Sequence, residues 1–146
     1  HVDNAEQAER IASAARFGPE GARSFGTSRG RDYGMHDMTP PEYMAAFNRE
    51  VTVAIQIETK NAVDTIEEIL DVDGIDLITF GAQDLAQSYG HPGLPDHPEV
   101  VEAMESVVTA VHARGRLMSS DVERGINLVQ WLPERLQSWL AESKSK

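Results

Sequence analysis

Apolar and polar residues alternate between positions 51 and 59, where the chain reads Val-Thr-Val-Ala-Ile-Gln-Ile-Glu-Thr. A period of two is typical of a β-strand with one buried face, so we predict a strand over Val51–Ile57. The apolar face consists of Val51, Val53, Ile55 and Ile57. The other face consists of Thr52, Ala54, Gln56 and Glu58. Gln56 and Glu58 therefore point the same way at the end of the strand, roughly 6–7 Å apart.

A second apolar run, Ile75–Phe80, follows the first after a segment with helical periodicity. Asn61 is predicted to cap the intervening helix, and Gly74 to end it. The inward positions of this helix are predicted to be Val63, Ile66, Ile69 and Leu70. A strand–helix–strand unit of this length makes its two strands parallel and adjacent, so both carboxyl ends lie at one edge of the sheet.

Helices are also predicted ahead of this unit. Asp3 and Glu6 have the spacing of a capping box that begins an N-terminal helix. The apolar stripe of that helix comprises Ala8, Ile11, Ala12 and Ala15. Gly18–Thr39 lacks periodicity and predicts a long loop. Pro40 and Pro41 then open a short helix, which carries Tyr43, Met44 and Phe47.

Beyond the second strand the pattern predicts a loop and then helices. Gly81–His97 is rich in glycine and proline and predicts a long loop, Pro98 begins the clearest helix of the chain, and Gly115 ends it. One apolar stripe of that helix comprises Val101, Met104, Val108 and Val111. Leu117–Ser119 is a weak candidate for a third strand. The last predicted segments are Ile126–Trp131, a further strand or the start of the last helix, and Leu132–Ala141, an amphipathic helix.

The number of strands limits the fold class. A chain of 146 residues is one domain's worth and can bury a core, so we predict a single α/β domain over residues 1–146. Two clear strands and one or two weak ones cannot close a barrel, and their edges would be exposed. The chain is therefore predicted to be part of a larger (β/α) assembly.

The composition of the chain excludes some classes of binding partner. A net charge of −11 argues against nucleic acid, which requires a basic surface, and no apolar run is long enough to predict a membrane span. The absence of cysteine excludes disulfides and thiolate metal sites, and it fits a cytoplasmic protein. Arginines are concentrated in the first third, which favours either a local anion site or a solvated surface; they are Arg10, Arg16, Arg23, Arg29 and Arg31.

Two carboxylates at the predicted strand ends are the main candidates for chemistry. Glu58 follows the first strand, and Asp84 follows the second within Phe80–Leu85. Parallel α/β sheets build their sites at this edge, and Mg²⁺ or Mn²⁺ accepts one or two carboxylates together with water and substrate oxygens. The alternative is structural, with Glu58 capping the following helix and Asp84 capping a turn.

Other polar residues are weaker candidates. Gln56 could donate to a substrate carbonyl, and Gly81–Asp84 offers backbone N–H groups that could hold a carboxylate. Arg23 lies between glycines, in a loop where it could meet a ligand or pair with a surface acid. His91 and His97 fall in the glycine- and proline-rich loop, where we expect solvent-exposed residues rather than metal ligands. The chain contains neither a phosphate-binding glycine motif nor His-Glu-x-x-His.

Six short motifs resemble those of one known family in order and spacing, over about residues 1–118. They are Phe-Gly-Pro-Glu-Gly-Ala-Arg at 17–23, Tyr-Gly at 33–34, Gln-Ile-Glu-Thr at 56–59, Gly-Ile-Asp at 74–76, Phe-Gly-Ala-Gln-Asp-Leu at 80–85 and His-Pro-Glu-Val at 97–100. The family is the HpcH/HpaI aldolases, which are metal-dependent class II pyruvate aldolases. The family's usual Gly-Pro before the metal-binding aspartate reads Gly81-Ala82 here.

The resemblance implies a TIM-type (β/α) barrel, incomplete here because the family's N-terminal half would precede His1. It implies Glu58 and Asp84 as metal ligands, and it implies substrate contacts from Gln56, Gln83 and Asp84, with Gln83 acting through its backbone amide. The implied cofactor is Mg²⁺ or Mn²⁺, with Co²⁺ as a further option. The implied reaction cleaves or forms a carbon–carbon bond next to the enolate of pyruvate or another 2-keto acid.

The resemblance also indicates what to expect outside the chain. The histidine linked to the catalytic base and the arginine that steadies the enolate would lie upstream of His1, so the catalytic residues themselves are unknown. The segment after Leu117 is shorter than in the family. Homo-oligomers are implied, with residues 132–146 forming a C-terminal helix and tail available for their contacts.

Two alternative functions stay open. One is a citrate lyase β-type or citrate-forming enzyme, which shares the fold and the enolate chemistry. The other is a non-catalytic half-barrel fragment that associates through strand edges and an apolar stripe of Leu132, Leu136 and Leu140. A chain that starts at His1 suggests processing, a cropped sequence or a partial gene model.

Overall fold

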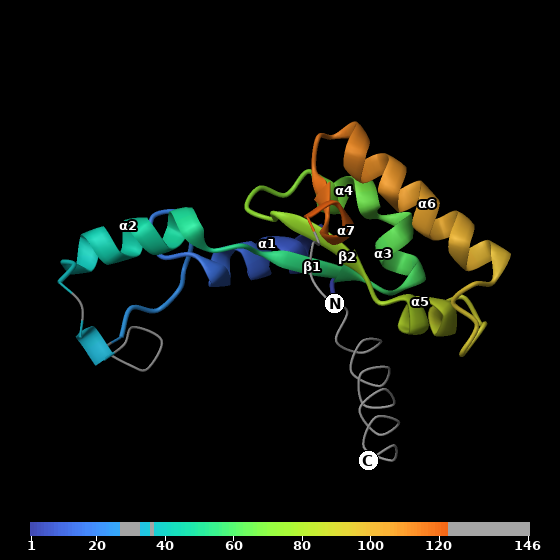
Figure 1. Cartoon of the computed structure of the whole chain (residues 1–146), viewed down its shortest axis with the longest axis horizontal. Coiled ribbons are helices and arrows are strands. Elements are labelled where there is room, and N and C mark those ends of the chain that lie inside the picture. Colours follow the sequence, from blue (N-terminus) through green and yellow to red (C-terminus); the bar gives the residue numbers. More distant parts are fainter. Residues whose placement is uncertain (27–32, 36, 123–146) are drawn as a thin grey trace, which may run out of the picture.

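The computed structural model in Figure 1 describes residues 1–26, 33–35 and 37–122. Its centre is a parallel sheet of three strands in the order β1 (Ala54–Ile57), β2 (Leu77–Phe80) and β3 (Leu117–Met118). The register pairs Ala54 with Leu77 and Ile57 with Phe80. The predicted parallel, adjacent strands are therefore confirmed, and among the described residues the sheet is open.

Both main strands begin later than the alternating pattern predicts. The N–H of Val53 donates to the Asp76 carboxylate at 2.7 Å, and the carbonyl of Val53 accepts from the N–H groups of both Asp76 and Leu77. A side chain thus takes the place of a backbone partner at this point, and the regular ladder begins at Ala54. The predicted inner face is confirmed, since Val53, Ile55 and Ile57 are buried.

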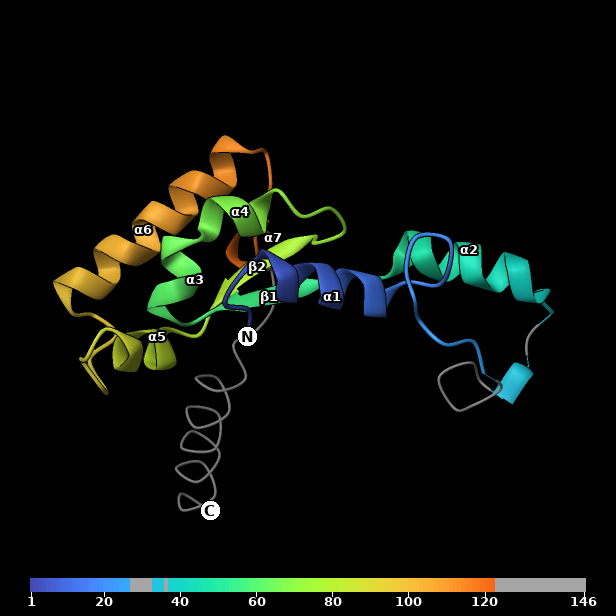
Figure 2. The same cartoon turned by 180° about the vertical axis from the view of Figure 1, so that it is seen from behind.

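Helices cover one face of the sheet, and Figure 2 shows the arrangement from behind. α4 (Ile66–Leu70) contacts both α1 (Ala5–Ala15) and α6 (Pro98–Ala113). The core lies between these helices and the strands, and it includes Ala8, Ala12, Ile55, Ile57, Ile66, Ile69, Leu70, Ile78, Val107 and Val111. The opposite face of the sheet stays partly accessible, as the 45% exposure of Leu117 shows.

The helix predicted from Asn61 is two helices, α3 (Lys60–Asp64) and α4, which meet at Thr65. The predicted cap was wrong by two residues, because Thr59 Oγ1 accepts from the N–H of Ala62. Asn61 instead donates to the carbonyl of Asp3 at 2.7 Å. Its side chain therefore ties the two segments together rather than ending a helix.

The N-terminal cap is also displaced by one residue. Asn4, not Asp3, is the N-cap of α1, and its side chain accepts from the N–H of Gln7. The Gln7 side chain reciprocates by accepting from the N–H of Asp3 at 2.9 Å. The Asp3 carboxylate accepts instead from Thr59 Oγ1 at 2.5 Å, which links the start of α1 to the start of α3.

The predicted long loop over Gly81–His97 was wrong in its first half. α5 (Ala82–Ser88) occupies it, since Leu85 and Ala86 are buried against Val100 of α6. α6 itself has the predicted bounds, and Gly115 follows it with φ of +65°. Its fully buried face is Val100, Ala103, Val107 and Val111. Of the predicted stripe, Val111 is buried, Met104 and Val108 are partly buried against the core, and Val101 is exposed.

β3 is confirmed as a two-residue strand, and Ser119 begins α7 (Ser119–Val122) instead of continuing it. Met118 N–H donates to the Asp121 carboxylate at 2.8 Å, which turns the chain out of the sheet. The segments predicted over Ile126–Trp131 and Leu132–Ala141 lie outside the described residues. None of the described helices combines the length and apolar character needed to cross a membrane.

α2 (Pro40–Glu50) lies away from the sheet, beyond the end of α1 (Figures 1 and 2). Thr39 precedes it, and the Thr39 N–H and hydroxyl both donate to the Glu42 carboxylate. Asn48 is the buried link to the body: Phe17 N–H donates to its oxygen at 2.7 Å, and its amide donates to the Phe17 carbonyl at 2.8 Å. Aromatic rings complete this contact, namely Phe17, Phe25, Tyr43 and Phe47.

Replacing Asn48 by alanine tests this link. Asn48→Ala is expected to lower the free energy of unfolding by about 2–3 kcal/mol, because a buried N–H and a buried C=O lose their partners. Urea unfolding followed by circular dichroism measures the loss. Asn61→Ala is the matched control, since it removes an exposed bond to a backbone carbonyl and is expected to cost less than about 1 kcal/mol. Equal losses in both variants would contradict the role of Asn48.

Candidate functional site

The carboxyl edge of β1 and β2 brings together Gln56, Glu58 and Gly81. Gln56 Nε2 donates to Glu58 Oε2 at 2.7 Å, as expected for two side chains on the same face of a strand. Gly81 N–H donates to the Ile57 carbonyl at 3.1 Å, which continues the β1–β2 pairing one step past β2. The predicted shared orientation of Gln56 and Glu58 is therefore confirmed.

Gly81 is the residue that leaves room for these side chains. A Cβ atom built on it would collide with Glu58 Oε2 and Gln56 Nε2, and would lie 2.8 Å from Glu58 Cβ. The φ of Gly81 is −99°, which every residue type can adopt, so the need for glycine here is steric and not conformational. The edge therefore contains a close approach of polar side chains to bare backbone.

Glu58 is mostly buried and has two partners. Its side chain is 14% exposed, Oε2 accepts from Gln56, and Oε1 lies 3.0 Å from Nδ1 of His1. His1 reaches this position because Val2 N–H donates to the Gln56 carbonyl at 3.1 Å and lays the first residues alongside β1. The sequence analysis did not identify His1, since no periodicity indicates which strand it would lie beside.

Gln83 and Asp84 lie at the same edge of the sheet, in the first turn of α5, and both are exposed. The first N–H groups of a helix have no partner within the helix, so the backbone N–H groups here can donate to a ligand oxygen. The N–H of Gly81 is not available to a ligand, because it already donates to the Ile57 carbonyl. The predicted N–H donors of this segment are thus reduced to those of Ala82, Gln83 and Asp84.

A second group of polar side chains lies between α5 and α6. The His91 and His97 rings stack with centroids 3.5 Å apart, and His91 Nε2 is 3.0 Å from Glu99 Oε2. The hydrogen bond with His91 is the main cause that lowers the pKa of Glu99 below its ordinary value. Both histidines are half-buried, so the expectation of plainly exposed loop residues was wrong.

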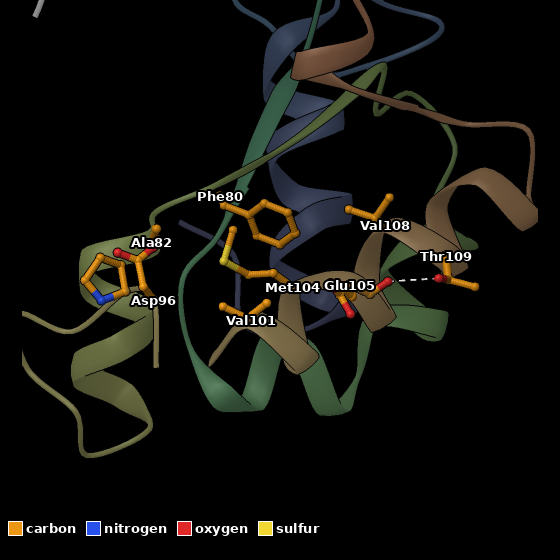
Figure 3. A pocket seen from close by; sticks show the side chains of 9 residues that line it. Phe80, Ala82, Asp96, Val101, Met104, Glu105, Val108 and Thr109 are labelled. Atoms are coloured by element: carbon orange, nitrogen blue, oxygen red, sulfur yellow. Dashed lines mark hydrogen bonds between the residues drawn. The ribbon is translucent and has the colours of Figure 1, made fainter. Parts of the chain in front are cut away.

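Figure 3 shows a pocket of about 580 Å³ between the end of β2 and α6. It is lined mainly by apolar side chains, including Phe80, Val101, Met104 and Val108. Val101, Met104 and Val108 belong to the apolar stripe that the helical pattern predicted for α6. Ala82 lines it, but the polar side chains of the carboxyl edge do not, so we do not assign the chemistry to this pocket.

The described arginines of the N-terminal third contact other residues of this chain. Arg16 donates to the Gly74 carbonyl at 2.6 Å and pairs with Asp76 at 3.1 Å. The Arg23 guanidinium lies over the Phe47 ring, 4.5 Å from its centroid, and Arg10 pairs with the exposed Glu6. Arg29 and Arg31 lie outside the described residues. The predicted anion site therefore receives no support from the arginines that are described.

Comparison with known proteins gives consistent matches along the chain. The family model described as HpcH/HpaI aldolase/citrate lyase matches residues 1–137. A 2-keto-3-deoxy-L-rhamnonate aldolase of Shigella sonnei (strain Ss046) is 39% identical over 117 residues, which cover 79% of this chain and 42% of that protein. The chain thus spans less than half the length of the curated relatives it matches.

Solved structures agree on the fold. The HpcH/HpaI aldolase/citrate lyase family protein of Burkholderia cenocepacia J2315 superposes with a TM-score of 0.79 at 27% identity, over 99% of this chain and 63% of that one. The HpcH/HpaI aldolase of Desulfitobacterium hafniense DCB-2 superposes with a TM-score of 0.74 at 28% identity, over 99% of this chain and 60% of that one.

The steric role of Gly81 can be tested directly. Gly81→Ala is expected to break the Gln56–Glu58 hydrogen bond and to lower the stability by about 1–3 kcal/mol, as overpacking does. The side-chain amide resonances of Gln56 in a ¹⁵N–¹H NMR spectrum report the bond. Gly26→Ala is the control, because no atom lies within 4 Å of a Cβ at that position. Unchanged Gln56 resonances in Gly81→Ala would show that the edge tolerates a side chain.

Proposed function

The chain belongs to the HpcH/HpaI aldolase/citrate lyase family, and on this premise we propose that its carboxyl edge binds a divalent cation and a pyruvate-like 2-keto acid. The activity that we propose is a carbon–carbon lyase reaction of the aldolase type. The observation that carries the proposal is the mostly buried carboxylate of Glu58, held beside the bare backbone of Gly81 at the end of β1.

The donor atoms at this edge fit a hard cation. Glu58 and Asp84 offer carboxylate oxygens, which Mg²⁺ and Mn²⁺ prefer, and Co²⁺ also accepts them. Each oxygen of Glu58 has one partner, and a carboxylate oxygen has two lone-pair positions, so Glu58 retains coordinating capacity. Asp84 is exposed in the first turn of α5, which leaves its carboxylate accessible from solvent.

A divalent cation bound here would supply Lewis-acid stabilisation of the negative charge that develops on the keto oxygen. The chain's own residues would orient the substrate. Gln56 has a second amide N–H beyond the one given to Glu58, and we assign it to a substrate oxygen. The Gln83 backbone amide and Asp84 would contact the pyruvate moiety from α5. His1 would position Glu58.

Proton transfer needs an acid–base group in addition to the binding residues of the carboxyl edge. The family resemblance places the base-linked histidine and the enolate-steadying arginine upstream of the matched region. The alignment covers 42% of the curated relative, so these groups fit in the part that it does not cover. We therefore assign binding and orientation to this chain and leave the catalytic acid–base residues unassigned.

The names of the relatives favour the aldolase branch over the citrate branch. Several curated relatives that match the chain, among them those of Shigella sonnei (strain Ss046) and Escherichia coli (strain K12), are named 2-keto-3-deoxy-L-rhamnonate aldolase. A 2-keto-3-deoxy acid with a hydroxyl at carbon 4 breaks between carbons 3 and 4, which releases an aldehyde and leaves the pyruvate enolate. We propose this class of substrate. Assembly into homo-oligomers and a cytoplasmic location stay predictions.

Calorimetric titration with Mn²⁺ and with Mg²⁺, in the presence and absence of oxalate, tests the site. Oxalate resembles the pyruvate enolate, so it is expected to tighten binding of the cation. Glu58→Ala and Asp84→Ala are each expected to weaken binding by about 100-fold or more, since loss of a second-shell partner alone costs about 10–100-fold.

Glu68→Ala is the matched control, because it removes an exposed carboxylate from α4, away from this edge. Circular dichroism checks that each variant keeps its fold. Wild-type Mn²⁺ affinity in a folded Glu58→Ala variant would refute the assignment and favour the reading of Glu58 and Asp84 as structural residues.

A further inference from the structure

We propose that His91, His97 and Glu99 form a binding site for a divalent transition-metal ion such as Zn²⁺. Among the described residues, these three are the one group of three or more metal-binding side chains whose ligand atoms converge. All three ligand atoms lie within 4.8 Å of one another. None of them belongs to the carboxyl edge, so the inference does not depend on the proposed function.

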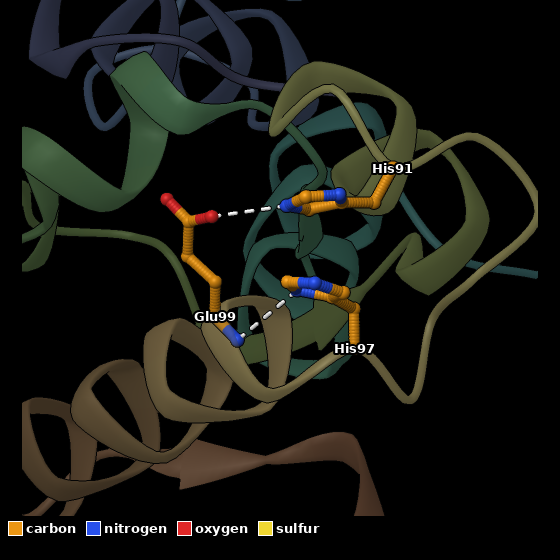
Figure 4. Close-up of side chains that lie close together, drawn as sticks. All are labelled: His91, His97 and Glu99. Atoms are coloured by element: carbon orange, nitrogen blue, oxygen red, sulfur yellow. Dashed lines mark hydrogen bonds and ion pairs between the residues drawn. The ribbon is translucent and has the colours of Figure 1, made fainter.

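The geometry of the three side chains is shown in Figure 4. His91 Nε2 lies 3.0 Å from Glu99 Oε2, and the two imidazole rings stack at 3.5 Å with 19° between their planes. Each ring turns a nitrogen towards the side on which Glu99 lies. The 3.0 Å between His91 Nε2 and Glu99 Oε2 is close to the ligand separation of four-coordinate Zn²⁺ at bond lengths of about 2.0–2.2 Å. The two stacked rings must rotate apart so that one nitrogen lone pair of each points at the same ion.

The backbone around the histidines is held in place before any ion binds. His91 N–H donates to the Ala86 carbonyl at 2.8 Å, which ties the first histidine to the end of α5. His97 N–H donates to the Leu94 carbonyl, and the carbonyl of His97 accepts from Val100 at the start of α6. Leu85 and Ala86 pack against Val100 and join the two helices. This preformed backbone lowers the entropic cost of binding, because only the two rings have to reorient.

The donor set favours transition metals over Mg²⁺. Imidazole nitrogen suits Zn²⁺, Ni²⁺ and Cu²⁺, whereas Mg²⁺ prefers an all-oxygen set. Two imidazole rings and one carboxylate leave a fourth tetrahedral position for water. Of these three residues, Glu99 is exposed and both histidines are half-buried, so the site is open to solvent on the Glu99 side.

The His97 ring already accepts a hydrogen bond, and an ion bound at the same nitrogen would replace it. The Glu99 N–H donates to His97 Nδ1 at 3.3 Å, which caps α6. That distance is beyond the usual range for an N–H donor, so the bond is weak and the nitrogen can be given to a cation at small cost. His91 has no such backbone bond from its ring, and its Nε2 faces the carboxylate alone.

The test is a Zn²⁺ titration of the Glu58→Ala variant by calorimetry. This background removes one of the two carboxylates of the carboxyl edge and the His1–Glu58 pair, so a failure of the proposed function does not affect the result. We expect one Zn²⁺ per chain at this site. Replacing His91 by glutamine, or Glu99 by glutamine, is expected to weaken binding by about 10-fold or more, by analogy with the loss of residues that support a metal site.

His112→Gln in the same background is the matched control. His112 and Asp121 form an exposed pair at 2.9 Å, very similar to that of His91 and Glu99, but without a second histidine. Zn²⁺ should also shift the ¹⁵N resonances of the His91 and His97 rings and leave those of His112 in place. Equal loss of affinity in the His91 and His112 variants, or no loss in a folded Glu99→Gln variant, would overturn the proposal.

Discussion

The backbone ladder between β1 and β2 determines the position of every polar group at the carboxyl edge. It pairs Ile57 with Phe80, and Gly81 N–H extends it by bonding to the Ile57 carbonyl. Gln56 and Glu58 then lie against Gly81, where no side chain competes for the space. A slip of one residue would turn Ile55 and Ile57 outwards and the polar pair into the core, so burial on one face enforces the register.

The two ends of the sheet differ in how their polar groups are used. At the amino end, the Asp76 carboxylate joins Val53 N–H to Arg16, and Arg116 donates to the carbonyls of Val72 and Ile75. These bonds consume the polar groups of the turn and stabilise it. At the carboxyl end, Glu58 and Asp84 keep lone pairs available, which is the usual division of labour in parallel α/β sheets.

The two candidate cation sites differ in donor chemistry. The carboxyl edge presents oxygen atoms from Glu58 and Asp84, which suits the hard cation expected of the family. The group between α5 and α6 presents two imidazole nitrogens and one carboxylate oxygen. Since affinity for divalent ions depends on donor type, the two sites would select different metals from the same solution. The apolar pocket near Met104 and Val108 belongs to neither of them.

The sequence by itself determined the strand–helix–strand unit, the inner face of β1 and the shared orientation of Gln56 and Glu58, because all three follow from local periodicity. It did not determine the buried face of α6, since Val100, Val101, Val107 and Val108 are all apolar and only packing distinguishes them. The helices are capped by Asn4 and Thr59 and not by the predicted Asp3 and Asn61. The Asp3 carboxylate accepts a hydrogen bond from Thr59, and the Asn61 side chain donates to the Asp3 carbonyl, so both side chains serve contacts between segments.

The contacts of His1 with Glu58 and of His91 with His97 depended entirely on the tertiary structure. His1 meets Glu58 only because residue 2 pairs with β1, and the two histidines stack only because α5 and α6 pack through Leu85 and Val100. Periodicity describes one element at a time, whereas these contacts arise between elements. The candidate residues at the strand ends could therefore be predicted from the sequence, and their partners could not.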